Sequence, residues 1–138
     1  MVPIFLIERA GHLQEEATTI GVANPKQVKS LTKALLKLMG PKKLALHFHD
    51  TRGTALANIY AGLEEGVRIF DSSSGGLGGC PYAPGAAGNV STEDLIYMLQ
   101  GMGVKTGVDL DKLTQASKYV QNILGRELPS RYLKASLR

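Results

Sequence analysis

Residues 43–71, KLALHFHDTRGTALANIYAGLEEGVRIFD, decide the fold of this chain. The apolar run over residues 43–49 predicts a short strand. Apolar side chains then recur at helical spacing over residues 54–65, and a second strand is predicted over residues 67–71. A strand, a helix and a strand in this order indicate parallel βα units, and therefore an α/β fold.

Three further helices are predicted from capping residues that precede apolar side chains at helical spacing. Their expected N-caps are Asn24, Ser91 and Asp109. Asp94, three residues after Ser91, completes the pattern of a capping box. Beyond Gly125 the tail is polar and basic, and we expect it to be loose.

Two strands make a very small parallel sheet, which should not stand alone in water. Either residues 3–7 add a third strand or the chain is part of something larger. We therefore expect one partial domain over residues 1–138. Because its strand edges and apolar face need cover, we expect a homo-oligomer or association with a missing N-terminal half.

The chain has 138 residues, of which 43% are apolar, and its net charge is +4. The lysines and arginines are scattered and aromatic residues make up 6%, so we expect no nucleic-acid partner. No apolar run approaches a bilayer span, so we expect no membrane partner. The charge fits a solvated basic surface, or attraction of an anionic ligand such as a phosphate-bearing coenzyme. A single cysteine and no visible targeting segment predict a bacterial cytoplasmic location.

Two histidines lie at the end of the first predicted strand, at the edge where parallel α/β folds collect function. Because a strand alternates faces, His47 and His49 should point the same way and could bind a divalent metal. The alternative is a pair of histidines that are only hydrogen-bonded at a strand end. Asp50 should point away, so we expect it to support the ligands or the structure.

Residues 72–89 hold six of the 16 glycines and the single cysteine. Glycines suit close approach to a ligand and motion as a lid, whereas the alternative is a flexible linker. Cys80 could act as acid, base or nucleophile, or be inert. Asn89 offers an amide oxygen suited to Mg²⁺ or Mn²⁺, or simply caps a turn. Two histidines and an asparagine are neutral, so a carboxylate is also expected, with Asp71 a candidate.

The motifs His47-Phe48-His49-Asp50-Thr51-Arg52-Gly53, Gly76-Leu77-Gly78-Gly79-Cys80-Pro81-Tyr82-Ala83 and Gly88-Asn89 resemble 3-hydroxy-3-methylglutaryl-CoA lyase. The resemblance covers about residues 19–124, and the Gly-Gly-Cys-Pro-Tyr-Ala block is highly specific. The His-x-His pattern alone would also admit isopropylmalate and homocitrate synthases.

The resemblance implies the C-terminal part of a TIM (β/α)₈ barrel, with the histidines on its seventh strand and Asp71 at the end of the eighth. It implies His47, His49 and Asn89 as ligands of a divalent metal, Mg²⁺ or Mn²⁺. It implies Cys80 as the catalytic cysteine and places Glu93 near the site, and His47 is our candidate base.

The implied reaction is cleavage of an acyl-CoA substrate, 3-hydroxy-3-methylglutaryl-CoA, to acetyl-CoA and acetoacetate, a step of leucine catabolism and ketone-body formation. The family's first-strand aspartate ligand and catalytic arginine have no counterpart here, and Thr18 replaces an acid of the sixth strand. The alternatives are therefore a non-catalytic barrel fragment that binds metal or assembles with another chain, and a related acyl-CoA lyase or synthase.

Overall fold

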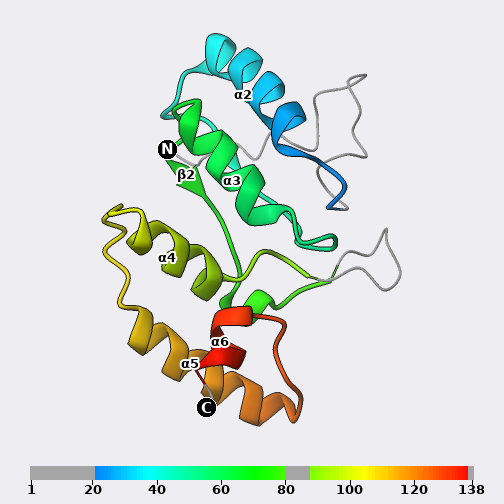
Figure 1. Ribbon diagram of the computed structural model, residues 1–138, viewed down its shortest axis with the longest axis vertical. Coiled ribbons are helices and arrows are strands. Elements are labelled where there is room, and N and C mark those ends of the chain that lie inside the picture. Colours follow the sequence, from blue (N-terminus) through cyan, green and yellow to red (C-terminus); the bar gives the residue numbers. More distant parts are fainter. Residues whose placement is uncertain (1–20, 80–87, 137–138) are drawn as a thin grey trace. The chain divides into compact units, whose positions relative to one another are not determined.

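The computed structural model describes residues 21–79 and 88–136, which divide into two compact units (Figure 1). The first unit, residues 21–71, contains α2 (Pro25–Met39), β1 (Ala45–Leu46), α3 (Ala55–Glu64) and β2 (Ile69–Phe70). The second, residues 72–79 and 88–136, contains the 3₁₀ turn η1 (Ser74–Gly76), α4 (Thr92–Gly101), α5 (Leu110–Leu124) and α6 (Arg131–Ala135). No helix within the described residues is both long and apolar enough to cross a membrane.

The first unit is built on two parallel strands joined through a helix. Ala45 pairs with Ile69 and Leu46 with Phe70, and α3 forms the connection. This confirms the predicted parallel βα arrangement. The first strand is shorter than the predicted range of residues 43–49. Leu44 and Phe48 are buried like strand residues but lie outside β1. The expected third strand over residues 3–7 lies outside the described residues.

The helix α2 packs on α3, beside it in Figure 1. Its N-terminus is held by the predicted cap, since Asn24 accepts from the Gln27 amide and the Gln27 side chain accepts from the Asn24 amide. Thr54 Oγ1 and Asn58 Nδ2 both donate to the Ala23 carbonyl, at 3.2 and 3.0 Å. The start of α2 is therefore fixed to α3. The buried face of α2 consists of Val28, Thr32 and Leu35.

In the second unit, the predicted caps of α4 and α5 are also confirmed. Ser91 accepts from the Asp94 amide at 3.3 Å, and Asp109 accepts from the Lys112 amide at 3.0 Å. The capping box expected at α4 is only half formed, because the Asp94 carboxylate does not return to the cap. It accepts hydrogen bonds from the C-terminal segment instead.

The expectation of a loose tail beyond Gly125 is wrong for residues 126–136. They form α6 and pack on the rest of the unit, and Leu128, Ser130 and Leu133 are fully buried. Although the segment is mostly polar, burial of Leu128 and Leu133 and the hydrogen bonds to the buried Asp94 carboxylate are enough to order it.

Candidate functional site

The parallel register brings His47 and Asp71 together. Because Leu46 pairs with Phe70, the next residue of each strand emerges at the same edge of the sheet. His47 Nδ1 lies 2.7 Å from Asp71 Oδ1. A carboxylate can only accept, so Nδ1 carries the proton and donates it, and the lone pair of the neutral imidazole is left on Nε2.

The two histidines lie side by side, as strand alternation predicted. Their ring centroids are 5.0 Å apart and the rings are nearly perpendicular, at 70°. The His47 side chain is about one-third exposed, whereas His49 is buried. A histidine whose Nδ1–H is held by a carboxylate is the usual preparation for metal binding through Nε2. The Nε2 atom of His47 is therefore available as one ligand of a divalent ion.

Asp50 holds the helix that follows the histidines. Its Oδ1 accepts from the Ala55 amide at 3.0 Å at the start of α3, and its carbonyl accepts from the Gly53 amide. The sequence predicted a supporting role for Asp50 beside the ligands. The hydrogen bonds support that role through the turn after His49, which they tie to α3.

In the second unit, Glu93 anchors the start of the glycine-rich loop. It is fully buried, and its two carboxylate oxygens accept from the Gly75 amide at 3.1 and 2.8 Å. The hydroxyls of Ser91 and Ser117 also donate to it. Gly75 has a φ of +61°, and a Cβ there would lie 2.3 Å from Leu128 Cδ1. Glu93 thus fixes a turn that only glycine fits.

Asn89 is oriented by the same loop. Its Nδ2 donates to the Leu77 carbonyl at 3.0 Å, which leaves the amide oxygen as the atom that could meet a ligand. Gly78 and Gly88 approach each other closely, since a Cβ on Gly88 would lie 1.9 Å from the Gly78 carbonyl oxygen. The amide oxygen of Asn89 suits Mg²⁺ or Mn²⁺ chemically.

The predicted site residues are distributed over both units. His47, His49, Asp50 and Asp71 belong to the first unit, and Asn89 and Glu93 to the second. Cys80 and Thr18 lie outside the described residues. Across residues 21–79 and 88–136, no three His, Cys, Asp or Glu side chains form a group that could hold a metal ion. Asp71, the candidate carboxylate ligand, orients His47 instead.

Sequence reasoning missed the hydroxyl groups that hold these carboxylates. Ser117 comes from α5 and Ser130 from the cap of α6, respectively 24 and 36 residues from their partners Glu93 and Asp94. Both serines are fully buried. The only local signal is that of Ser130, a capping residue before a short apolar segment.

The comparisons with known proteins agree with the resemblance. The family model described as HMGL-like matches residues 13–120. The hydroxymethylglutaryl-CoA lyase YngG of Bacillus subtilis is 55% identical over 116 residues, which are 84% of this chain and 39% of that protein. The chain therefore spans about two-fifths of the length of this relative.

Two solved structures extend the comparison to the fold. The crystal structure of the Bacillus subtilis HMG-CoA lyase matches with a TM-score of 0.84 and 53% identity, over 87% of this chain and 40% of that one. The HMG-CoA lyase from Acinetobacter baumannii, in complex with coenzyme A and 3-methylmalate, matches with a TM-score of 0.81 and 50% identity, over 85% and 38%. The predicted fold class, part of a TIM barrel, is confirmed.

Proposed function

Because this chain belongs to the HMGL-like family, we propose that it carries part of the active site of a lyase that cleaves 3-hydroxy-3-methylglutaryl-CoA to acetyl-CoA and acetoacetate. The observation that carries the proposal is the His47–Asp71 hydrogen bond with His49 beside it, at the carboxyl edge of two parallel strands. We propose that residues 1–138 form part of a single barrel domain.

The proposed ligands of a divalent metal, Mg²⁺ or Mn²⁺, are His47, His49 and Asn89. Nε2 of His47 and the amide oxygen of Asn89 are the atoms that the hydrogen bonds of the structure leave for this role. Asn89 joins the set on the sequence resemblance. A bound divalent ion would supply Lewis acidity, lowering the pKa of the substrate hydroxyl and orienting the breaking bond.

The reaction is a retro-Claisen cleavage. A base removes the proton of the C3 hydroxyl, the C3 oxygen becomes the ketone of acetoacetate, and the electron pair of the broken carbon–carbon bond passes to the enolate of acetyl-CoA. We propose that Cys80 protonates this enolate. Nδ1 of His47 is bonded to Asp71, so both proposed roles of His47, as base and as metal ligand, depend on the single lone pair of Nε2. His47 can therefore fill only one of these roles at a time.

Glu93 supports the site from a distance. Its bonds to the Gly75 amide and to two serine hydroxyls hold the turn from which the glycine-rich loop departs. Asp50 does the same for the histidine segment through α3. Both are proposed to position the reacting groups rather than to touch them.

A second candidate function is a barrel fragment that binds metal or assembles with another chain without catalysing the reaction. The observation that favours a non-catalytic role is that, within the described residues, no three His, Cys, Asp or Glu side chains form a group that could hold a metal ion, so the catalytic set would need another chain to complete it. An N-terminal half would then supply the missing carboxylate and arginine, whereas a homo-oligomer would cover the strand edges and the apolar face. Two further predictions remain. The substrate could be a related acyl-CoA, and the protein is expected in the cytoplasm of a bacterium.

The test is acetoacetate formation from 3-hydroxy-3-methylglutaryl-CoA with Mn²⁺ or Mg²⁺, measured for the 138-residue chain and for the chain extended by the N-terminal half of a relative. We expect little activity from the chain alone and activity from the extended protein, abolished by Cys80→Ala. No activity in the extended protein would contradict the lyase proposal. Robust activity of the 138-residue chain would contradict the fragment function.

Calorimetry with Mn²⁺ tests the ligand assignment without turnover. Asp71→Asn should weaken Mn²⁺ binding about 10- to 100-fold, because the residue that orients the ligand is lost. His49→Ala should weaken it further. Equal heats for the wild-type chain and His49→Ala would refute the assignment.

A further inference from the structure

Lysines gather along one side of α2. Residues 21–49 contain six lysines and no aspartate or glutamate. Four lie on the helix three or four residues apart, so they fall within about 80° of its circumference. We call these four the lysine row: Lys26, Lys29, Lys33 and Lys37. The residues buried against the unit lie on the other side of the helix, and Lys42 and Lys43 follow its C-cap.

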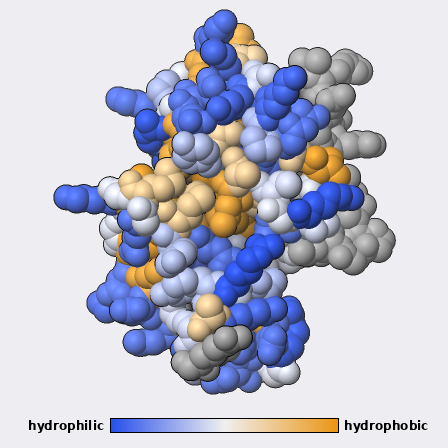
Figure 2. Space-filling view, in the orientation of Figure 1, coloured by the Kyte–Doolittle hydropathy of each residue, from blue (hydrophilic) through white to orange (hydrophobic). Residues whose placement is uncertain are grey.

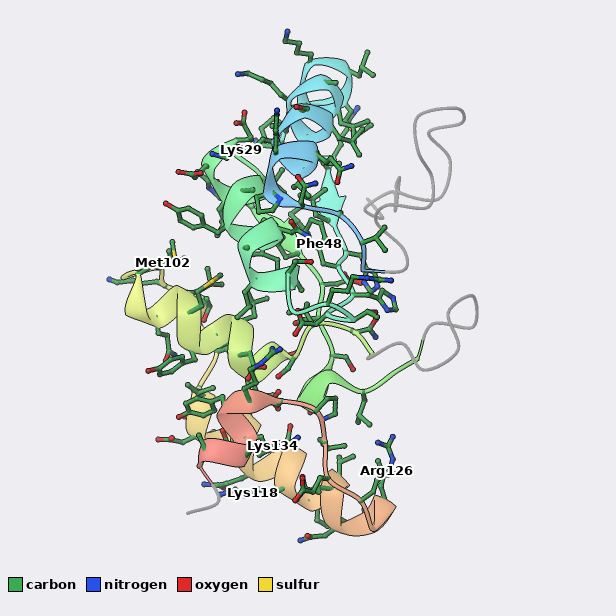
Figure 3. All side chains as sticks on the ribbon, turned by 45° about the vertical axis from the view of Figure 1, so that its right-hand side comes forward. Lys29, Phe48, Met102, Lys118, Arg126 and Lys134 are labelled. Atoms are coloured by element: carbon green, nitrogen blue, oxygen red, sulfur yellow. The ribbon has the colours of Figure 1, made fainter. Side chains whose placement is uncertain are left out.

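The charge of the row is largely unbalanced. Lys26, Lys33 and Lys37 are exposed, and the neighbouring helix α3 offers Glu64 and Glu65 near its end. Glu64 is already bonded to Lys29, at 2.6 Å between Oε2 and Nζ. Figure 3 shows the Lys29 side chain extending from α2 toward α3.

The excess of positive charge is concentrated in the first unit. Residues 21–71 contain eight lysines and arginines against four carboxylates, whereas the described part of the second unit contains six against five. Figure 2 shows hydrophilic side chains projecting where α2 lies in Figure 1. The row is therefore the main positive surface of its unit.

The row begins at the end of α2 that lies nearest the histidines. Residues just before the helix contact the segment that carries them. A Cβ on Gly21 would lie 2.9 Å from Thr51 and 3.0 Å from the carbonyl oxygen of His49. Lys26 is therefore near this end, and Lys37 lies about 16 Å further along the helix.

We propose that the lysine row attracts and holds the phosphate groups of a coenzyme A-type ligand. The choice of coenzyme A rests on the proposed function. Such a ligand carries a diphosphate and a 3′-phosphate on a flexible chain. Lysines about 5–6 Å apart can meet several phosphates at once. As flexible point charges, they suit loose capture and guidance toward a site rather than a rigid pocket.

The composition of this surface disfavours a nucleic-acid partner. Residues 21–46 contain no aromatic side chain on which a base could stack and no arginine to read a base edge. The row thus offers positive charge to phosphate groups and no side chain that would read a nucleobase.

The test is a titration of coenzyme A into the 138-residue chain, followed by backbone amide chemical shifts. Two variants with the same net charge are compared, Lys33→Gln/Lys37→Gln in the row and Lys105→Gln/Lys112→Gln in the second unit. We expect the shifts to centre on α2. The dissociation constant should rise about five-fold in the row variant and by about two-fold or less in the control.

At about 1 M salt, where the Debye length is about 3 Å, the difference between the variants should disappear. Equal weakening in both variants, or shifts that leave α2 unchanged, would overturn the proposal. The titration needs no turnover, so its outcome is separate from acetoacetate formation by the extended protein. Coenzyme A binding at the lysine row without lyase activity of the extended protein refutes only the proposed function. Lyase activity of the extended protein with no coenzyme A binding at the lysine row refutes only this inference.

Discussion

Asp94→Ala should release α6 from the second unit. The Asp94 carboxylate is buried, with 8% of the residue exposed. It accepts from Ser130 Oγ at 2.8 Å, from the Tyr132 amide at 2.7 Å and from the Arg131 amide at 3.1 Å. The substitution removes all three acceptor contacts at once and leaves three donors without them.

The size of the effect follows from these contacts. A hydrogen bond to a charged group contributes about 1.5–3 kcal/mol. Water can reach part of the N-terminus of α6 once the helix loosens, so the three bonds together should contribute about 3 kcal/mol rather than their sum. That free energy corresponds to a population of the released helix about 100-fold higher.

Hydrogen exchange measures this release directly. In Asp94→Ala the Tyr132 and Leu133 amides should exchange about 100-fold faster, while amides of α5 change less. Asp109→Ala is the matched control, because Asp109 caps α5 in the same unit but is exposed to solvent. Exchange of the Tyr132 amide within about two-fold of the wild-type rate would refute the reasoning.

Three further predictions concern other contacts. Gly75→Ala should destabilise the second unit by about 2 kcal/mol or more in urea unfolding, since the left-handed φ and the clash with Leu128 act together. A hydrogen bond from Lys29 lowers the pKa of Glu64, so the contribution of this pair to folding stability is fully present above the usual carboxyl pKa of 4.5. That contribution is lost as pH falls through the lowered pKa. The melting temperatures of the wild-type chain and Glu64→Gln should accordingly converge in acid. Light scattering should find a dimer or larger species, and a stable monomer at high concentration would contradict the expected self-association.

The helices could be predicted because their signals are local. The caps Asn24, Ser91 and Asp109 each lie within three residues of the amide that they accept from. The predicted cap Asn24 therefore agrees with the start of α2 at Pro25, and the apolar spacing over residues 54–65 agrees closely with α3 at Ala55–Glu64. The strand lengths could not be predicted in the same way, because an apolar run reports burial and not the pairing partner.

The contacts of the C-terminal segment could not be predicted because they join distant residues. Asp94 looked like half of a capping box, and the polar composition beyond Gly125 looked like a loose tail. The structure joins the two, with Asp94 bonded to residues 130–132. Likewise Glu93 could be placed near the site by resemblance, but its partner Ser117 on α5 carries no motif.

The pairing of His47 with Asp71 depends on a close approach of α3 to the strands. A Cβ on Gly62 would lie 2.7 Å from Leu46 Cδ1 and 3.3 Å from the Phe70 ring, so the helix sits directly on the paired residues. Leu46 and Phe70 are the last pair of the ladder, and His47 and Asp71 follow them. A slip of one residue would oppose His47 to the Ser72 hydroxyl, which can donate to Nδ1 and so leave the tautomer unfixed. Gly62 on α3 therefore helps to set the register that places Asp71 against Nδ1 of His47.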